Sequence, residues 1–218
     1  MQDVNKQMKM ITSLIYKTYL IKETCKKLDN VQLYTSLEAV GTKAEYIRYG
    51  LNYKTFWDNL DRLLNEVPGL KITFMCTYNA LSVTSFTNFL KEINKRRFEL
   101  PWDVGNPQLS VSVPYLRHPT FLSIKTLDSS FRKYVEDSVN FMIDNCGGHG
   151  APGFTPIEVN AMKRILSWFD NTSPTDELII NRTDFVKYFD EYDKRKGTNF
   201  LKTFPEYKNF YNMCKKLC

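Results

Sequence analysis

The sequence predicts an α/β protein whose strands run parallel to one another. Short apolar segments rich in strand-forming residues alternate with amphipathic helical segments between residues 31 and 115. A strand that leads through a helix into the next strand pairs with it in parallel, by a right-handed crossover. Beyond residue 128 the pattern is helical, so a helical C-terminal region is expected to follow the strands.

The first 30 residues predict a leading amphipathic helix. Apolar residues recur near helical spacing between Asp3 and Asn30, and lysines fill the other face. We therefore expect three parts: this helix at residues 1–30, β/α units at residues 31–128 and a mainly helical region at residues 129–218.

The middle part is predicted to contain three strands, at Val31–Leu37, Leu70–Thr77 and Gln108–Tyr115. β-Branched and aromatic residues recur in all of them, as is typical of strands. Helices are expected between them at Tyr53–Val67 and Thr84–Asn94. The first of these helices is followed by a Pro-Gly pair, which does not continue a helix.

The last part combines a helical pattern with a modest excess of basic residues. From residue 182 to residue 218 there are nine Lys/Arg and five Asp/Glu, an excess of four. The two signs are mixed with aromatics, which favours a solvated helix face over a nucleic-acid surface, and no RNA-binding signature is present. We expect no nucleic-acid partner. The predicted helices are Ser130–Asn145, Thr155–Phe169, Asn181–Lys196 and Pro205–Leu217.

The composition is that of a chain that can bury a sizeable core. It has 218 residues, of which 43% are hydrophobic and 14% aromatic, and a net charge of +6. No apolar run approaches the roughly 20 residues that cross a bilayer. The N-terminus lacks the charged-then-apolar order of a signal peptide. We therefore expect a cytoplasmic protein without a membrane partner.

The five cysteines do not suggest a disulfide framework, because their number is odd and the chain is long. Cys214 and Cys218 stand at helical i,i+4 spacing, which places both thiols on one face if the terminus is wound. Two thiolates do not complete a zinc or iron–sulfur site. We assign no metal to the chain. A frayed or half-buried terminal helix is the alternative reading of this pair.

Polar residues follow the predicted strands, where catalytic groups of α/β barrels collect. Ser36 and Glu38 lie at the end of the first strand, and His118 follows the third. We take all three as candidate ligand-binding residues. A single histidine beside a proline is also a common loop-packing residue, so a purely structural role for His118 stays open.

Four strings together resemble the later part of a known protein family. They are "TSLEAVGTKAEYIRYGLNYKTFWDNLDRLL", "ITFMCTYNALSVTSFTNFLKEI", "PYLRHPTFLSIKTL" and "RTDFVKYFDEYDKRKGTNFLKTFPE". They resemble radical S-adenosylmethionine (radical SAM) proteins of the twitch-domain-containing kind that is frequent in phage genomes. The resemblance extends from about residue 20 to the C-terminus.

The resemblance implies an incomplete (β/α)6 barrel of the TIM type, with the three predicted strands as its fourth, fifth and sixth. In that family a 4Fe-4S cluster, held by a CxxxCxxC loop after the first strand, reduces S-adenosylmethionine. A 5′-deoxyadenosyl radical is released and abstracts a hydrogen atom from the substrate. The fold class expected here is therefore a half-barrel of parallel strands with flanking helices, followed by a helical region.

The resemblance also assigns roles to individual residues. Ser36 and Glu38 match the groups that meet the ribose, although the family more often has Ser-x-Asp. Arg48 matches a polar group near the methionine carboxylate, which a guanidinium binds through two parallel hydrogen bonds. Thr77 and Asn79 are placed within reach of the adenosine. For Arg48 a surface ion pair with Glu45 or Glu38 is the alternative.

The departures from the family are large. The chain contains no CxxxCxxC, and the first three strands are not expected in it. A 4Fe-4S cluster could therefore come only through a partner chain. The Val31–Leu37 strand would also have a bare edge, which the leading helix, a second copy or a separate chain could cover. We expect the C-terminal half of a radical SAM enzyme that is inactive alone; the alternative is a non-catalytic structural or interaction protein.

Overall fold

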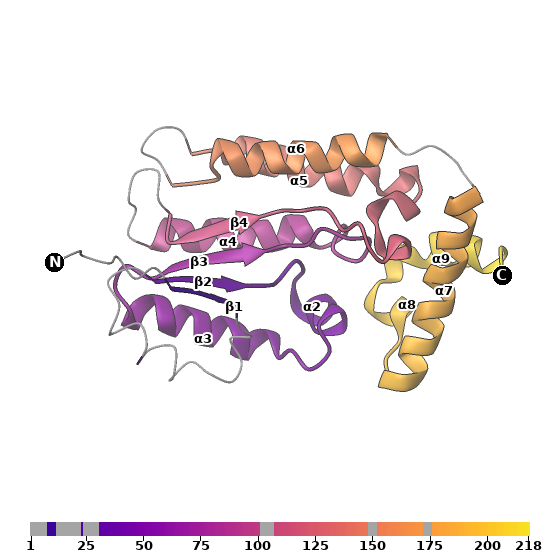
Figure 1. The fold of residues 1–218 in the computed structure, drawn as a ribbon, viewed down its shortest axis with the longest axis horizontal. Helices are drawn as coiled ribbons and strands as arrows, with labels where there is room; N and C mark the ends of the chain where they lie inside the picture. The colour runs from indigo at the N-terminus through magenta and orange to yellow at the C-terminus, as the bar shows by residue number, and fades with distance from the viewer. Residues whose placement is uncertain (1–7, 12–22, 24–30, 101–106, 148–151, 172–175) are drawn as a thin grey trace.

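The structure, a computed structural model, describes residues 8–11, 23, 31–100, 107–147, 152–171 and 176–218. Its centre is a sheet of four parallel strands in the order β1-β2-β3-β4 (Figure 1). The predicted α/β class with parallel strands is confirmed. The strands are β1 (Met8–Ile11), β2 (Val31–Thr35), β3 (Lys71–Met75) and β4 (Leu109–Ser112).

The prediction of a helix within the first 30 residues is wrong at Met8–Ile11, whereas Glu23, the other described residue of this segment, is helical. Met8–Ile11 is a strand that pairs in parallel with β2, Met8 opposite Val31 and Ile11 opposite Tyr34. Met8 and Met10 are two residues apart, which is the spacing of one face of a strand. A stretch of four residues is too short for its pattern to distinguish a strand from a helix. The rest of the predicted helix, apart from Glu23, lies outside the described residues. The expectation of a bare edge at Val31–Leu37 is also wrong, because β1 occupies that edge.

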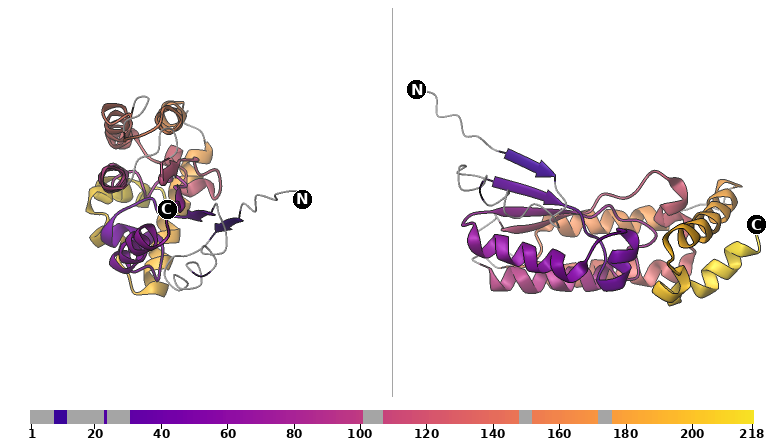
Figure 2. Two further views of the ribbon diagram at one scale, coloured as in Figure 1. Left: turned by 90° about the vertical axis from the view of Figure 1, so that its left-hand side faces the viewer. Right: turned by 90° about the horizontal axis from the view of Figure 1, so that it is seen from below.

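Two helices cover the same face of the sheet. They are α3 (Tyr53–Glu66), between β2 and β3, and α4 (Phe86–Glu99), between β3 and β4. The ring of Phe74 on β3 lies 5.7 Å from the Trp57 ring of α3 and 5.5 Å from the Phe89 ring of α4. One side chain of one strand thus touches both helices, and Figure 2 shows them on one side of the sheet. The two helices that connect β2 to β3 and β3 to β4 therefore lie on one face of the sheet.

The opposite face of the sheet is polar. β2 alternates buried and half-buried residues, whereas a parallel sheet covered on both faces is apolar throughout. Gln32 Nε2 donates to Thr73 Oγ1 at 3.0 Å, and the hydroxyls of Thr73 and Ser110 are 2.7 Å apart. A row of hydrogen-bonded side chains therefore crosses β2, β3 and β4 on this face.

A buried ion pair closes the far edge of the sheet. Helices α5 (Arg132–Asp144) and α6 (Pro156–Asp170) lie beyond β4 (Figure 1). Glu158, in the first turn of α6, accepts from Arg97 at 2.5 Å and from the backbone N–H of Val111 on β4 at 2.7 Å. Its carboxylate also completes a capping box with Thr155. One side chain thereby joins α4, β4 and α6.

The C-terminal helices lie at the end of the sheet toward which the strands point (Figure 1). Tyr207 donates its hydroxyl proton to the carbonyl of Ala80, in the loop after β3, and Lys43 of α2 pairs with Glu206. The helices of this region are α2 (Gly41–Ile47), α7 (Asp176–Lys196), α8 (Phe200–Thr203) and α9 (Lys208–Lys215), and 3-10 turns span Thr120–Leu122, Ile124–Thr126, Ser129–Phe131 and Pro205–Tyr207.

The remaining predicted helices are present, with ends that differ from the prediction by up to five residues. The predicted helices at Tyr53–Val67, Thr84–Asn94, Ser130–Asn145, Thr155–Phe169, Asn181–Lys196 and Pro205–Leu217 correspond to α3, α4, α5, α6, α7 and the 3-10 turn with α9. Helix α8 was not predicted. None of the helices in the described ranges combines the length and the apolar character needed to span a membrane.

Candidate functional site at the strand ends

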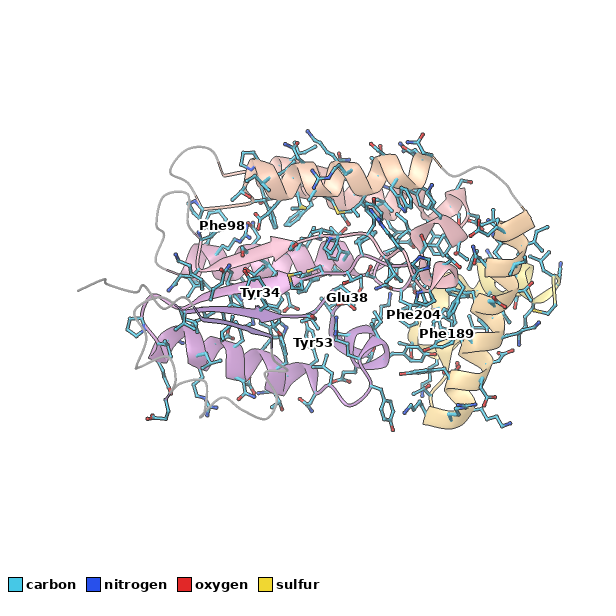
Figure 3. All side chains as sticks on the ribbon, in the orientation of Figure 1. Tyr34, Glu38, Tyr53, Phe98, Phe189 and Phe204 are labelled. Carbon is cyan, nitrogen blue, oxygen red and sulfur yellow. The ribbon has the colours of Figure 1, made fainter. Side chains whose placement is uncertain are left out.

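The carboxyl ends of β2, β3 and β4 meet at one edge of the sheet, where α2 and α7 approach them. Ser36 and Glu38 follow β2, Thr77 and Asn79 follow β3, and His118 follows β4. The structure joins Glu38 to Arg48 and places Thr77 and Asn79 in the wall of one pocket. Figure 3 shows Glu38 between the strand ends and α2, with Phe189 and Phe204 beyond it toward the C-terminal helices.

Glu38 and Arg48 form a partly buried ion pair. Arg48 Nη2 lies 2.5 Å from Glu38 Oε2, and the two side chains are 34% and 4% exposed. Helix α2 lies between them in sequence and turns the chain back so that they meet. Arg48 therefore pairs with Glu38, whereas the Glu45 carboxylate accepts a hydrogen bond from the backbone N–H of Tyr53 at 2.9 Å. Arg48 Nε is buried without a hydrogen-bond partner, so this guanidinium has donor capacity left inside the protein.

The environment of Glu38 opposes its ionisation. Burial raises the pKa of this carboxyl above its usual value of 4.5, while the charge and hydrogen bond of Arg48 pull the pKa back down. Burial, and then the charge of Glu38, raise the pKa of the Cys76 thiol above its usual value. The Cys76 thiol donates to the carbonyl of Leu37 at 3.0 Å and so links the ends of β2 and β3.

A pocket of about 320 Å³ opens at the same edge of the sheet, although neither Glu38 nor Arg48 lines it. Its walls come from α2, from the loops after β3 and β4, and from α7. Ile47, one of the wall residues, directly precedes Arg48 in the chain. The volume lies at the lower end of the range of roughly 300–1,000 Å³ that small-molecule sites occupy. The wall residues are Tyr46, Ile47, Thr77, Asn79, Leu81, Leu116, Pro119, Leu122, Tyr188, Phe189 and Tyr192.

Asn79 shapes the loop after β3. Its Nδ2 donates to the Thr77 carbonyl at 2.8 Å, and its Oδ1 accepts from the Leu81 backbone N–H at 2.9 Å. Its own backbone N–H donates to Ser82 Oγ at 3.0 Å. This is an Asx turn, in which the side chain bonds to the nearby backbone. One amide hydrogen and one lone pair at most are left for a ligand.

Two of the three tyrosine hydroxyls in the wall, those of Tyr46 and Tyr192, are hydrogen-bonded to protein groups. Tyr46 donates to Asp193 at 2.9 Å, and Tyr192 donates to the carbonyl of Tyr46 at 2.9 Å. Burial, and then Asp193, raise the pKa of Tyr46 above its usual value of 10.0. Asp193 also accepts from the Thr198 hydroxyl and the Phe200 backbone N–H, both at 2.6 Å. The two tyrosines therefore have their hydroxyls occupied.

The other candidates lie apart from the pocket. His118 is exposed, although its neighbour Pro119 lines the wall, and Ser36 is half-buried. Cys214 is buried and Cys218 is exposed at the end of the chain. Across the described ranges no group of three or more His, Cys, Asp or Glu side chains could hold a metal ion.

Sequence reasoning missed the aromatic contribution of α7 and α2 to the pocket. Tyr188, Phe189 and Tyr192 follow one another at spacings of one, three and four residues, which is the pattern of one helix face. That pattern could have identified a buried face. It could not have shown that the face lies against the strand ends. No family model, no curated protein and no solved structure matches this chain.

Proposed function

We propose that this chain is the C-terminal half of a radical SAM enzyme, which needs a separate cluster-bearing half for catalysis. It supplies strand ends that contact S-adenosylmethionine and the substrate. The observation that carries the proposal is that the Glu38–Arg48 pair and a pocket both lie at the carboxyl edge of a parallel sheet. In parallel α/β proteins this edge is where ligands bind.

The winding of the chain supports an arc of a barrel. Strand order follows sequence order, and α3 and α4 cover the same face. A doubly wound sheet reverses its strand order and carries helices on both faces, whereas a barrel keeps its helices outside. The polar row of Gln32, Thr73 and Ser110 would then face the barrel interior. In this reading β1 takes the place of the third strand, which the sequence had not led us to expect.

The polar groups at the strand ends suit parts of S-adenosylmethionine. The free Nε of Arg48 is a buried donor, and a guanidinium can bind the methionine carboxylate through two hydrogen bonds. Glu38 can accept hydrogen bonds from the ribose hydroxyls once Arg48 turns to the carboxylate. Ser36 is a further candidate, whereas Thr77 lies in the wall of the pocket. Asn79 is less available than the resemblance implies, because its amide already bonds on both sides.

The residues present do not fit a 4Fe-4S cluster. The sequence has no CxxxCxxC, and its two closest cysteines lie at the opposite end of the chain from the expected position. Three or four thiolates are needed to hold such a cluster. We therefore derive no step through the cluster from this chain. In the proposed enzyme a partner chain supplies it.

The structure suggests where such a partner would join. Glu158 and α6 close the β4 edge of the sheet, since the carboxylate takes the N–H of Val111. The β1 edge is the one at which earlier barrel strands would add. The face of the sheet that would line the barrel carries hydrogen-bonded polar side chains and not the apolar residues of a divided hydrophobic core. The completed barrel would therefore enclose a polar cavity.

The test is to purify the chain anaerobically together with the proteins encoded beside it. We expect a complex with the visible absorbance of an iron–sulfur cluster that cleaves S-adenosylmethionine to 5′-deoxyadenosine. Arg48→Met should weaken cleavage, while Arg117→Met, an exposed loop change, should not. A stable complex with neither a cluster nor cleavage would exclude the catalytic role. A CxxxCxxC protein encoded nearby would strengthen it.

The alternative is a non-catalytic interaction protein that has kept the scaffold. One observation favours it: Glu38 and Arg48 are paired with each other. An ion pair that exists only to stabilise the loop would need no ligand. Stoichiometric incorporation of the chain into a larger assembly, with no cleavage activity in that assembly, is the result that the alternative predicts.

A further inference from the structure

The pocket under α7 has a chemistry of its own, distinct from that of the Glu38–Arg48 pair. Its wall carries no Lys, Arg, Asp or Glu side chain. Aromatic rings come from two directions: Tyr46 from α2, and Tyr188, Phe189 and Tyr192 from α7. The Tyr46 and Tyr192 rings are 5.1 Å apart, and those of Tyr188 and Tyr192 stack at 6.1 Å. These rings form one continuous aromatic surface.

Most of the polar atoms in this wall are already used. The hydroxyls of Tyr46 and Tyr192 donate within the protein, and the Asn79 amide is bonded at both of its ends. An anionic group placed here would lose its hydration without gaining an opposite charge, which is strongly unfavourable. The wall therefore selects against phosphates and carboxylates.

The same argument disfavours a purine. An adenine ring brings several nitrogen atoms that need hydrogen-bond partners, and each buried polar atom without a partner costs about 1–3 kcal/mol. The wall offers the Thr77 hydroxyl, the hydroxyl of the 43% exposed Tyr188 and the remaining capacity of Asn79. An aryl or alkyl group needs no more than that.

We propose that this pocket binds a neutral aromatic or aliphatic group of a small organic molecule. In the enzyme proposed above this group belongs to the substrate, and only that identification rests on the proposed function. The ring faces of α2 and α7 hold the group, and Thr77 can contact one polar atom on it. Arg48, which follows the wall residue Ile47 in the chain, serves the methionine carboxylate of S-adenosylmethionine in that enzyme.

The experiment uses the full chain and N-phenyl-1-naphthylamine, a neutral dye whose fluorescence rises in apolar surroundings. We expect one dye molecule per chain. Leu122→Trp fills the pocket, and Leu122→Asn makes its wall polar at similar volume. Each should weaken dye binding by at least about tenfold. Ile157→Trp is the matched control, because this side chain is 79% exposed and does not line the pocket. Circular dichroism verifies that each variant is folded.

Three results would overturn the inference. The folded wild-type chain could fail to bind the dye, which is expected if another segment of the chain or a second copy fills the pocket. Binding could be unchanged in both Leu122 variants, which would place the dye elsewhere. S-adenosylmethionine could displace the dye, which would make this the adenosine site. None of these results bears on whether the complex cleaves S-adenosylmethionine, so the two proposals fail separately.

Discussion

Two ion pairs in this protein look alike in distance and differ in burial. Arg97 and Glu158 are 1% and 6% exposed, whereas Arg48 and Glu38 are 34% and 4% exposed. Arg97 also donates to the Gly153 carbonyl at 2.7 Å, and its guanidinium lies 4.9 Å from the Phe154 ring. Glu158 in turn accepts two backbone N–H groups, those of Val111 and Thr155. The first pair is enclosed by the fold, and the second reaches solvent from one side.

Arg97→Met is expected to destabilise the protein by about 3–5 kcal/mol, because it leaves the Glu158 charge buried without its partner. The measurement is urea unfolding followed by circular dichroism. Lys54→Met is the control, since the Lys54–Asp58 pair is 84% and 58% exposed and should contribute less than about 1 kcal/mol. Equal losses in the two variants would contradict a structural role for the buried pair.

Arg48→Met should make stability depend more strongly on pH. Burial already raises the pKa of Glu38 above 4.5 in the folded state, and Arg48 is the group that opposes this shift. A raised folded pKa means that the folded state binds the proton more tightly, so stability is lost as the pH rises from 4.5 through the folded pKa. Without Arg48 the folded-state pKa of Glu38 is raised further, so the pH range over which stability is lost becomes wider.

The expected deficit of Arg48→Met relative to wild type is about 1–3 kcal/mol at pH 7, reduced from the fully buried case because Arg48 is partly exposed. The deficit should shrink toward acidic pH, where Glu38 is protonated in both states. Unfolding curves at several pH values between neutral and acidic measure it. A deficit independent of pH would show that Glu38 is not the group involved.

At the scale of elements, the sequence predicted what depends on local pattern and missed what depends on packing. The strands β2, β3 and β4 and the longer helices have clear periodicity. Helix α2 has only seven residues and shows no clear periodicity. A four-residue strand such as β1 is too short for its pattern to be distinguished from that of a helix. The ends of these strands could be predicted to within two or three residues, which was enough to locate Glu38 just beyond β2.

The aromatic wall of the pocket could not be predicted for a different reason. Tyr46 lies more than 140 residues from Asp193 and Tyr192, to which it is hydrogen-bonded. Contacts at that separation arise only once the C-terminal helices fold back onto the strand ends. Likewise, that Arg48 pairs with Glu38 and not with Glu45 follows from the turn after α2, which directs Glu45 to the N–H of Tyr53.

The attachment of the C-terminal helices can be tested at one hydroxyl. Tyr207 is fully buried and donates to the Ala80 carbonyl in the loop after β3. Tyr207→Phe should cost about 1–3 kcal/mol, because the carbonyl is left without that donor. Tyr134→Phe, at a side chain that is 37% exposed, should be nearly neutral. Thermal or urea unfolding compares the two.

At the scale of the whole molecule, the core runs without interruption from the sheet into the C-terminal helices. The rings of Tyr46 and Phe204 are 5.3 Å apart, and those of Phe131 and Tyr207 are 4.6 Å apart. These contacts connect α2 and the start of α5 with the last helices. The protein is therefore one cooperative body in this structure, although the chain reads as several parts in sequence.

We accordingly expect a single unfolding transition. Thermal unfolding followed by circular dichroism and by tryptophan fluorescence should give coincident curves, since Trp57 and Trp168 lie in different layers of the same core. Limited proteolysis below the transition should not release the C-terminal helices as a stable fragment. Two separated transitions would show that these helices fold independently of the sheet.

The carboxylate of Asp193 connects the wall of the pocket to the turn at Thr198 and Phe200. It holds the Tyr46 hydroxyl in the wall and, with its other contacts, the turn at Thr198 and Phe200. A ligand that moves the Tyr46 ring must also disturb this turn. We therefore expect ligand binding in the pocket to change the hydrogen–deuterium exchange rate of the Phe200 amide, which can be measured without a label in the pocket.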